Sequence, residues 1–80
     1  MDIEALLSRI VMDPAIMNGY PAIRNLDISV EDILVYLARI LDIHKLHLNF
    51  PDLDNKDIQA ALLFAAGLVK DERVFPIDHN

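Results

Sequence analysis

The stretch SVEDILVYLARIL, residues 29–41, carries the strongest structural pattern in the chain. Ser29 offers a hydroxyl at a helix N-cap and Asp32 follows three residues later, which is close to a capping box. The apolar residues recur at the spacing of one helix face: Val30, Ile33, Leu34, Leu37, Ala38 and Leu41. The opposite face carries Glu31, Asp32, Tyr36 and Arg39. This spacing excludes a strand and predicts an amphipathic helix that begins after Ser29.

A short second helix is predicted directly after this stretch. Asp42 can cap it, and Pro51 ends it near Asn49 because proline disfavours helical geometry at Phe50. The residues expected to face inward are Ile43 and Leu46.

A third helix follows a tight connection at residues 51–53, with Asp54 as its N-cap. Its expected apolar stripe consists of Ile58, Ala61, Leu62, Ala65 and Val69. Gly67 lowers helical stability, so we expect the helix to end between Ala66 and Lys70.

The first 28 residues predict a small β-hairpin. Short β-prone runs at residues 10–12 and 22–24 are separated by Asp-Pro and Asn-Gly-Tyr-Pro turn signals. Residues 2–8 could add a turn of helix, and its inward-facing residues would be Ile3, Leu6 and Leu7.

These elements predict a mainly α-helical chain with one domain over residues 1–70. Its hairpin segment spans about residues 8–28, and residues 71–80 form a C-terminal tail. A domain of this size buries only about 60% of the surface of its unfolded chain, so a partner or a second copy would help to stabilise it.

Charge and composition narrow the class of protein. Thirteen acidic against seven basic residues leave a net charge of −6, which disfavours nonspecific nucleic-acid binding by the isolated chain. Apolar content of 54% is high for 80 residues, and some of that surface is expected to form an interface. The absence of cysteine excludes disulfides and thiolate metal sites. With no long apolar run and no basic leader at the start, we expect a cytoplasmic protein.

Catalytic patterns are lacking, so we expect a protein that is not an enzyme and has no cofactor. There is no glycine-rich phosphate loop, and the serines are Ser8 and the cap Ser29. His44 and His47 have a spacing that metals can use, but exposed histidines on a polar helix face are commonplace. No metal site is predicted.

Three helices, of which the second is short and is joined tightly to the third, outline a helix-turn-helix. Motifs in a specific order accompany this outline: Asp13-Pro14, Gly19-x-Pro21-x-Ile23, Ile28-x-Val30, Phe50-Pro51-x-Leu53 and Asp57-Ile58-x-Ala60-Ala61-Leu62. From about Leu7 to Ala66 the chain resembles the small bacterial family called domain of unknown function 433. The resemblance implies a three-helix, homeodomain-like helix-turn-helix bundle with a short β-hairpin ahead of it. It also implies an antitoxin that pairs with a PIN-like ribonuclease toxin and can repress its own promoter.

The chain departs from that family pattern at basic and glycine positions. Gly19-Tyr20-Pro21 stands where members usually carry Gly-Lys-Pro, and Asn25-Leu26-Asp27 stands where they carry Gly-Thr-Arg. The usual glycine between the first two helices is Ile40. Asn25 can still provide a left-handed turn, which asparagine tolerates better than most residues.

The third helix offers a candidate DNA-facing set, Asn55, Lys56 and Gln59, whose side chains can reach base edges and phosphates. Three acids crowd the same end, and no basic patch accompanies them: Asp52, Asp54 and Asp57. The plainer interpretation is an ordinary solvated first turn. The alternative is DNA binding by a dimer, or by a complex whose partner supplies positive charge.

The same helix is apolar nearly all round, which predicts burial on two sides. The candidate protein interface consists of Ala60, Leu63, Phe64 and Gly67 on the helix and of Val74, Phe75 and Ile77 in the tail. The alternative is that the N-terminal segment or the tail covers this face within one chain.

Together these observations favour a noncatalytic binding protein, an antitoxin-like partner of a PIN-like ribonuclease toxin with optional autoregulatory DNA binding. Two alternatives stay open: a helix-turn-helix DNA-binding regulator without a toxin, and a self-associating structural or interaction protein.

Overall fold

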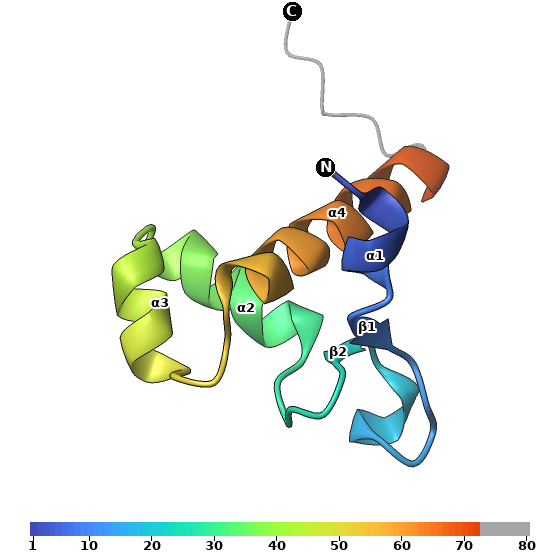
Figure 1. Cartoon of the computed structure of the whole chain (residues 1–80), viewed down its shortest axis with the longest axis horizontal. Coiled ribbons are helices and arrows are strands. Elements are labelled where there is room, and N and C mark those ends of the chain that lie inside the picture. Colours follow the sequence, from blue (N-terminus) through green and yellow to red (C-terminus); the bar gives the residue numbers. More distant parts are fainter. Residues whose placement is uncertain (73–80) are drawn as a thin grey trace, which may run out of the picture.

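The computed structural model describes residues 1–72 and is mainly helical (Figure 1). Its elements follow in the order α1 (Ile3–Leu7), β1 (Ile10–Val11), a 3-10 turn (Met17–Gly19), β2 (Ala22–Ile23), α2 (Val30–Arg39), α3 (Ile43–Asn49) and α4 (Asn55–Glu72). Within the described residues there are thus four α-helices and one small antiparallel sheet. The three longer helices and the hairpin agree with the sequence prediction, α1 is the turn of helix that residues 2–8 allowed, and the 3-10 turn was not predicted. None of these helices combines the length and the apolarity needed to cross a membrane.

Helix α2 begins at the capping box expected from the sequence. The Ser29 hydroxyl accepts the backbone N–H of Asp32 at 2.9 Å, and the Asp32 carboxylate accepts the backbone N–H of Ser29 at 3.3 Å. The helix ends at Arg39, and Ile40 has an extended backbone with φ −127°. Leu41 therefore lies outside the helix and is 92% exposed, so its predicted place on the core face is wrong.

The caps of α3 and α4 are also those that the sequence indicates. Asp42 accepts the backbone N–H of Lys45 at 3.0 Å, and Asp54 accepts the backbone N–H of Asp57 at 2.8 Å. The Asp57 carboxylate in turn accepts a hydrogen bond from the backbone N–H of Asp54 at 3.1 Å. Helix α4 continues to Glu72, beyond the expected range, because the one turn that contains Gly67 does not interrupt it.

The two strands pair in antiparallel register, with Ile10 opposite Ile23 and Val11 opposite Ala22. The backbone N–H of Arg24 donates to the carbonyl of Arg9 at 2.7 Å and so extends this pairing by one step. After β2 the chain turns sharply at Asn25, which has the left-handed φ of +67° expected from its place in the sequence.

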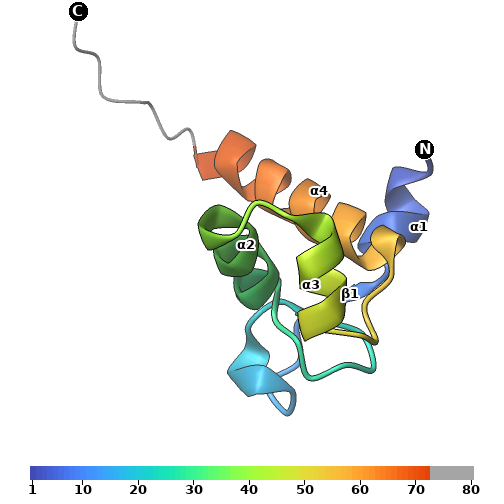
Figure 2. The same ribbon diagram turned by 90° about the vertical axis from the view of Figure 1, so that its left-hand side faces the viewer.

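The core lies where α2, α3 and α4 meet the hairpin (Figures 1 and 2). Its buried members are Ile23, Val30, Ile33, Leu46, Leu53, Ile58 and Ala61. Tyr36, expected on the polar face of α2, packs against this core instead. Its ring meets that of Phe50 edge to face at 6.0 Å, and its hydroxyl donates to the carbonyl of Lys45 at 3.3 Å. Tyr36 thereby joins α2 to α3.

Fewer side chains of helix α1 are buried than the sequence suggests. Leu6 is buried against the body, but Ile3 and Leu7 are exposed. A helix of five residues presents only about one and a half turns, so one side chain can reach a neighbour while the others face solvent. Leu6 lines a pocket with Lys56 and Gln59, so it lies on the side of α1 that faces α4.

Candidate interaction surface on helix α4

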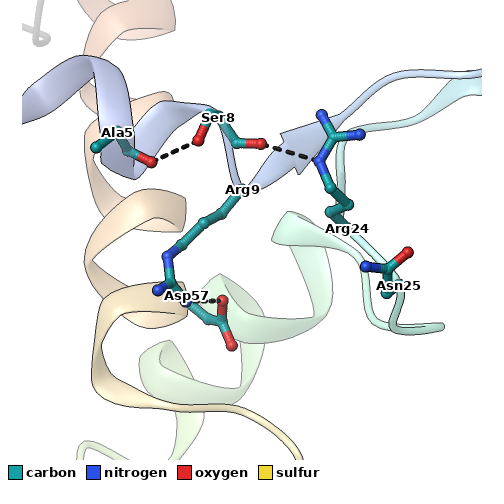
Figure 3. Close-up of a pocket in the computed structure, with 6 residues that line it drawn as sticks. All are labelled: Ala5, Ser8, Arg9, Arg24, Asn25 and Asp57. Atoms are coloured by element: carbon teal, nitrogen blue, oxygen red, sulfur yellow. Dashed lines mark hydrogen bonds and ion pairs between the residues drawn. The ribbon is translucent and has the colours of Figure 1, made fainter.

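The N-terminal end of α4 is built around Arg9, which comes from the start of the hairpin. Its Nη1 donates to Oδ1 of Asp57 at 2.9 Å (Figure 3). The same nitrogen donates to both oxygens of the Asp54 carboxylate at 3.1 Å. Asp57 is buried, so Arg9 supplies the cation that a buried carboxylate requires. The backbone N–H of Asp57 lowers the pKa of Asp54, and the Arg9 guanidinium acts in the same direction. The hydrogen bond to Asp57 raises the pKa of Arg9.

The sequence reasoning missed Arg9. The sequence did contain one indication of a basic partner: Asp57 lies among the apolar positions of the third helix. A buried aspartate at such a position needs a positive partner from elsewhere in the chain.

The three candidate DNA-facing residues are all exposed, and Gln59 lines one opening with Asn55 and another with Lys56. Asn55 is bonded to His47, whose Nε2 lies 2.8 Å from Oδ1 of Asn55, and the other ring nitrogen donates to the carbonyl of Leu53 at 3.0 Å. Lys56 and Gln59 instead line an open pocket with Ala5 and Leu6 of α1 and with Arg9. Asn55 is therefore engaged in the turn between α3 and α4.

Apolar side chains continue the outward face of α4 beyond Gln59. Leu62 and Ile43 are both exposed and line one shallow groove with Asn55 and Gln59. Two of the three acids at this end, Asp54 and Asp57, are paired with Arg9, which leaves Asp52. A surface with this apolar content and no cluster of cations suits a protein better than a phosphate backbone.

Two of the predicted protein-interface residues are placed wrongly. Ala60 has no exposed surface, because α1 packs along α4: Lys56, one turn before Ala60, lies in a pocket with Ala5 and Leu6. Phe64 packs against the core. At Ala60 the structure agrees with the alternative in which the N-terminal segment covers this face, because α1 packs on this part of α4.

The two remaining helix positions of the predicted interface differ in their exposure to solvent. Leu63 is half-buried, and Gly67 is exposed, with no atom within 4 Å of the position that a Cβ would occupy. Val74, Phe75 and Ile77 lie outside the described residues.

The exposed apolar surface of α4 lies nearer its C-terminal end than expected. Leu62, Leu68 and Val69 are 48%, 47% and 59% exposed, so the predicted burial of Leu62 and Val69 is wrong. Leu62 lies in the first half of α4, on the side that faces solvent. For Leu68 and Val69 the cause is the length of α4, which has 18 residues, whereas none of the other helices has more than 10. The last turns therefore extend past α2 and α3 (Figures 1 and 2). We name Leu62, Ala66, Gly67, Leu68 and Val69 the α4 apolar surface.

The histidines do not assemble a metal centre in residues 1–72, where no group of three or more histidine or acidic side chains is arranged to hold an ion. His44 is exposed and His47 is bonded to Leu53 and Asn55.

A family model described as "Protein of unknown function (DUF433)" matches residues 10–65. The chain belongs to the DUF433 family. The match runs from β1 into α4 and confirms the resemblance carried by the motifs between Asp13 and Leu62. No curated protein and no solved structure matches this DUF433 chain. Helix α1 and the last turns of α4, with Leu68 and Val69, lie outside the matched residues.

Proposed function

We propose that this DUF433 protein is a noncatalytic, cytoplasmic binding protein, an antitoxin-like partner of a PIN-like ribonuclease toxin. The observation that carries the proposal is the α4 apolar surface, where three large aliphatic side chains and an open glycine lie on a helix that extends past the rest of the fold. Leu62 and Val69 share one face of α4 with Ala66, at the helical spacing i, i+4 and i+7, whereas Gly67 and Leu68 lie on other sides of the helix. Exposed apolar side chains on one helix face mark protein interfaces. The class of partner comes from the family resemblance, and α2, α3 and α4 are taken as a homeodomain-like helix-turn-helix.

Charge supports the same class of partner. A ribonuclease must attract phosphates and therefore presents basic residues around its RNA-binding cleft. A chain with a net charge of −6 is complementary to such a cleft, and like charge would keep it from RNA itself.

Co-expression with the product of the adjacent reading frame tests the proposal. We expect the tagged protein to retain that product through affinity purification, to form a complex of defined mass by light scattering, and to suppress its ribonuclease activity. Leu68→Asp and Val69→Asp should each weaken retention at least ten-fold, because a charge would enter the apolar contact. Leu41→Asp is the matched control, since Leu41 is even more exposed but lies between α2 and α3. Absence of retention by the unmodified protein would contradict the proposal.

DNA binding is the second candidate, favoured by one observation. Lys56 and Gln59 are exposed at the N-terminal end of α4, where a recognition helix meets the major groove. If this candidate holds, the chain without a toxin shifts its own promoter in a salt-sensitive way, and Lys56→Glu abolishes the shift. Lys45→Glu on α3 is the control. Self-association alone would instead give a dimer by light scattering with neither toxin retention nor a gel shift.

A further inference from the structure

A second feature of the molecule lies away from the α4 apolar surface, at the junction of α1, the hairpin and α4. An open pocket of about 540 Å³ is lined there by Ala5, Ser8, Arg9, Arg24, Asn25 and Asp57 (Figure 3). Two arginines and one aspartate give this lining a formal charge of +1, in a chain whose net charge is −6. Asp54, which is bonded to Arg9 just outside this lining, brings the local sum to zero, so the pocket is neutral within an acidic protein.

The hairpin register places the two arginines side by side. Ile10 pairs with Ile23, and the N–H of Arg24 bonds to the carbonyl of Arg9, so Arg9 and Arg24 are cross-strand neighbours. Their guanidinium groups extend in opposite directions, that of Arg9 toward Asp57 and that of Arg24 toward the carbonyl of Ser8 (Figure 3). Arg9 is compensated by Asp54 and Asp57. Arg9 makes both of the ion pairs found among the described side chains, so Arg24 has no carboxylate partner among them.

The acceptor atoms that line this pocket already accept hydrogen bonds from within the protein. The groups that remain available for a ligand are therefore mainly donors. Oδ1 of Asp57 accepts from Arg9 and Oδ2 accepts from the backbone N–H of Asp54. Arg24 donates through Nε alone, to the carbonyl of Ser8 at 3.0 Å. This bond fixes the plane of the guanidinium, and among the described residues neither of its terminal nitrogens has a partner. The complement of such a site is a group that accepts two hydrogen bonds and carries negative charge.

We propose that this pocket binds a carboxylate presented by a protein partner, with the terminal nitrogens of Arg24 as its main donors. Asn25 also lines the pocket, with its side chain near the backbone of Arg24 (Figure 3). A guanidinium holds a carboxylate through two parallel N–H···O bonds, which a pre-oriented fork makes at low entropic cost. A single negative charge suits the site because Asp54 and Asp57 lie close by and would repel a phosphate dianion. The carboxylate can belong to an acidic side chain or to a chain terminus.

The test is an NMR titration of the full-length chain, labelled with nitrogen-15, at constant ionic strength. One probe is an acetylated and amidated tripeptide with a single aspartate, the second is an acetylated triglycine with an unblocked C-terminus, and the third is inorganic phosphate. We expect a saturable shift of the Arg24 Nε–H and of the Asn25 amide with at least one peptide, and the peptide that binds more tightly identifies the source. The toxin is not needed, so the result does not depend on the proposed function.

Arg24→Gln should weaken peptide binding on the order of ten-fold, because the fork is lost. Arg39→Gln is the matched control, since it removes an exposed arginine at the end of α2 and should leave binding unchanged. If Arg24→Gln disturbs the hairpin, Arg24→Lys decides instead: it keeps the charge, lacks the fork and should still bind several-fold more weakly. Unsaturable shifts overturn the proposal, and so does a peptide affinity in both Arg24 variants equal to that of the unmodified protein. Phosphate binding tighter than either peptide also overturns it, in favour of a nucleic-acid backbone.

Discussion

Arg9 connects residues that are 45 and 48 positions away in the sequence, Asp54 and Asp57. Through them it attaches the start of the hairpin to the N-terminal end of α4, where two carboxylates also interact favourably with the helix dipole. Neither aspartate identifies Arg9 from the sequence, because the pairing depends on how hairpin and helix pack. The contact is partly solvated, so its contribution is expected to respond to pH and to salt.

The pH dependence of stability tests this contact. The folded pKa of Asp54 lies below its ordinary value of 3.8, so its contribution is present above that value and is lost as the pH falls through the lower folded value. We expect Arg9→Gln to melt at a lower temperature than the unmodified protein at pH 7, and this difference to shrink as the pH is lowered below about 4. Thermal melts followed by circular dichroism measure it, with Arg39→Gln as the control. A difference that stays constant down to pH 2 would show that the pairing with Asp54 is unimportant.

Asn25 holds a left-handed backbone at a position where the family usually has glycine. A β-branched residue in that conformation costs about 1–2 kcal/mol, whereas glycine adopts it without strain. We therefore expect Asn25→Val to lower the free energy of unfolding in urea by about that amount, and Asn25→Gly to leave it within roughly 0.5 kcal/mol. Equal stabilities of the two variants would mean that the turn relaxes to another conformation.

At the scale of elements, the helix starts could be predicted from the sequence and the helix orientations could not. Ser29, Asp42 and Asp54 cap their helices through bonds to residues three positions later, so local sequence suffices. Ala60 depends instead on α1, a helix some 50 residues earlier in the chain, whose position on α4 no periodicity in α4 reveals. The same applies to Leu62, which has core spacing but lies on the side of α4 that faces solvent.

Helix α3 gives a matched pair of leucines that tests how the short elements are stabilised. Leu46 is fully buried in the core, whereas Leu48 is 69% exposed on the same helix. We expect Leu46→Ala to reduce the free energy of unfolding by about 2–5 kcal/mol and Leu48→Ala by less than about 0.5 kcal/mol. Urea denaturation at 25 °C measures both. Similar losses in the two variants would indicate that α3 is not packed as described.

At the scale of the whole molecule, the small core and the exposed apolar end of α4 both bear on the stability of the fold. Among the residues that the structure describes, the largest fully buried side chains are Ile23, Ile33 and Leu46, which is a small core. The α4 apolar surface is additional area that can be removed from water only by another molecule or by a segment outside the described residues. Stability is therefore expected to depend on association.

Leu68→Asp separates stability in the isolated chain from stability in a complex. Because Leu68 is exposed, the variant alone should melt within a few degrees of the unmodified protein. A saturating partner should raise the Tm of the unmodified protein, since binding to the folded state stabilises it by mass action, but not that of Leu68→Asp. Differential scanning calorimetry with and without the co-expressed product makes the comparison. The same increase in both proteins would place the interface elsewhere.

The position of Arg9 has a practical consequence for where the chain can be shortened. The family match begins at residue 10, one residue after Arg9 and three after the end of α1. A fragment trimmed to that boundary would keep the buried Asp57 but lose its cation, and would uncover Ala60 by removing α1. Such a fragment would test a damaged fold, so the smallest unit that can stand for this protein in a binding experiment has to include its first nine residues.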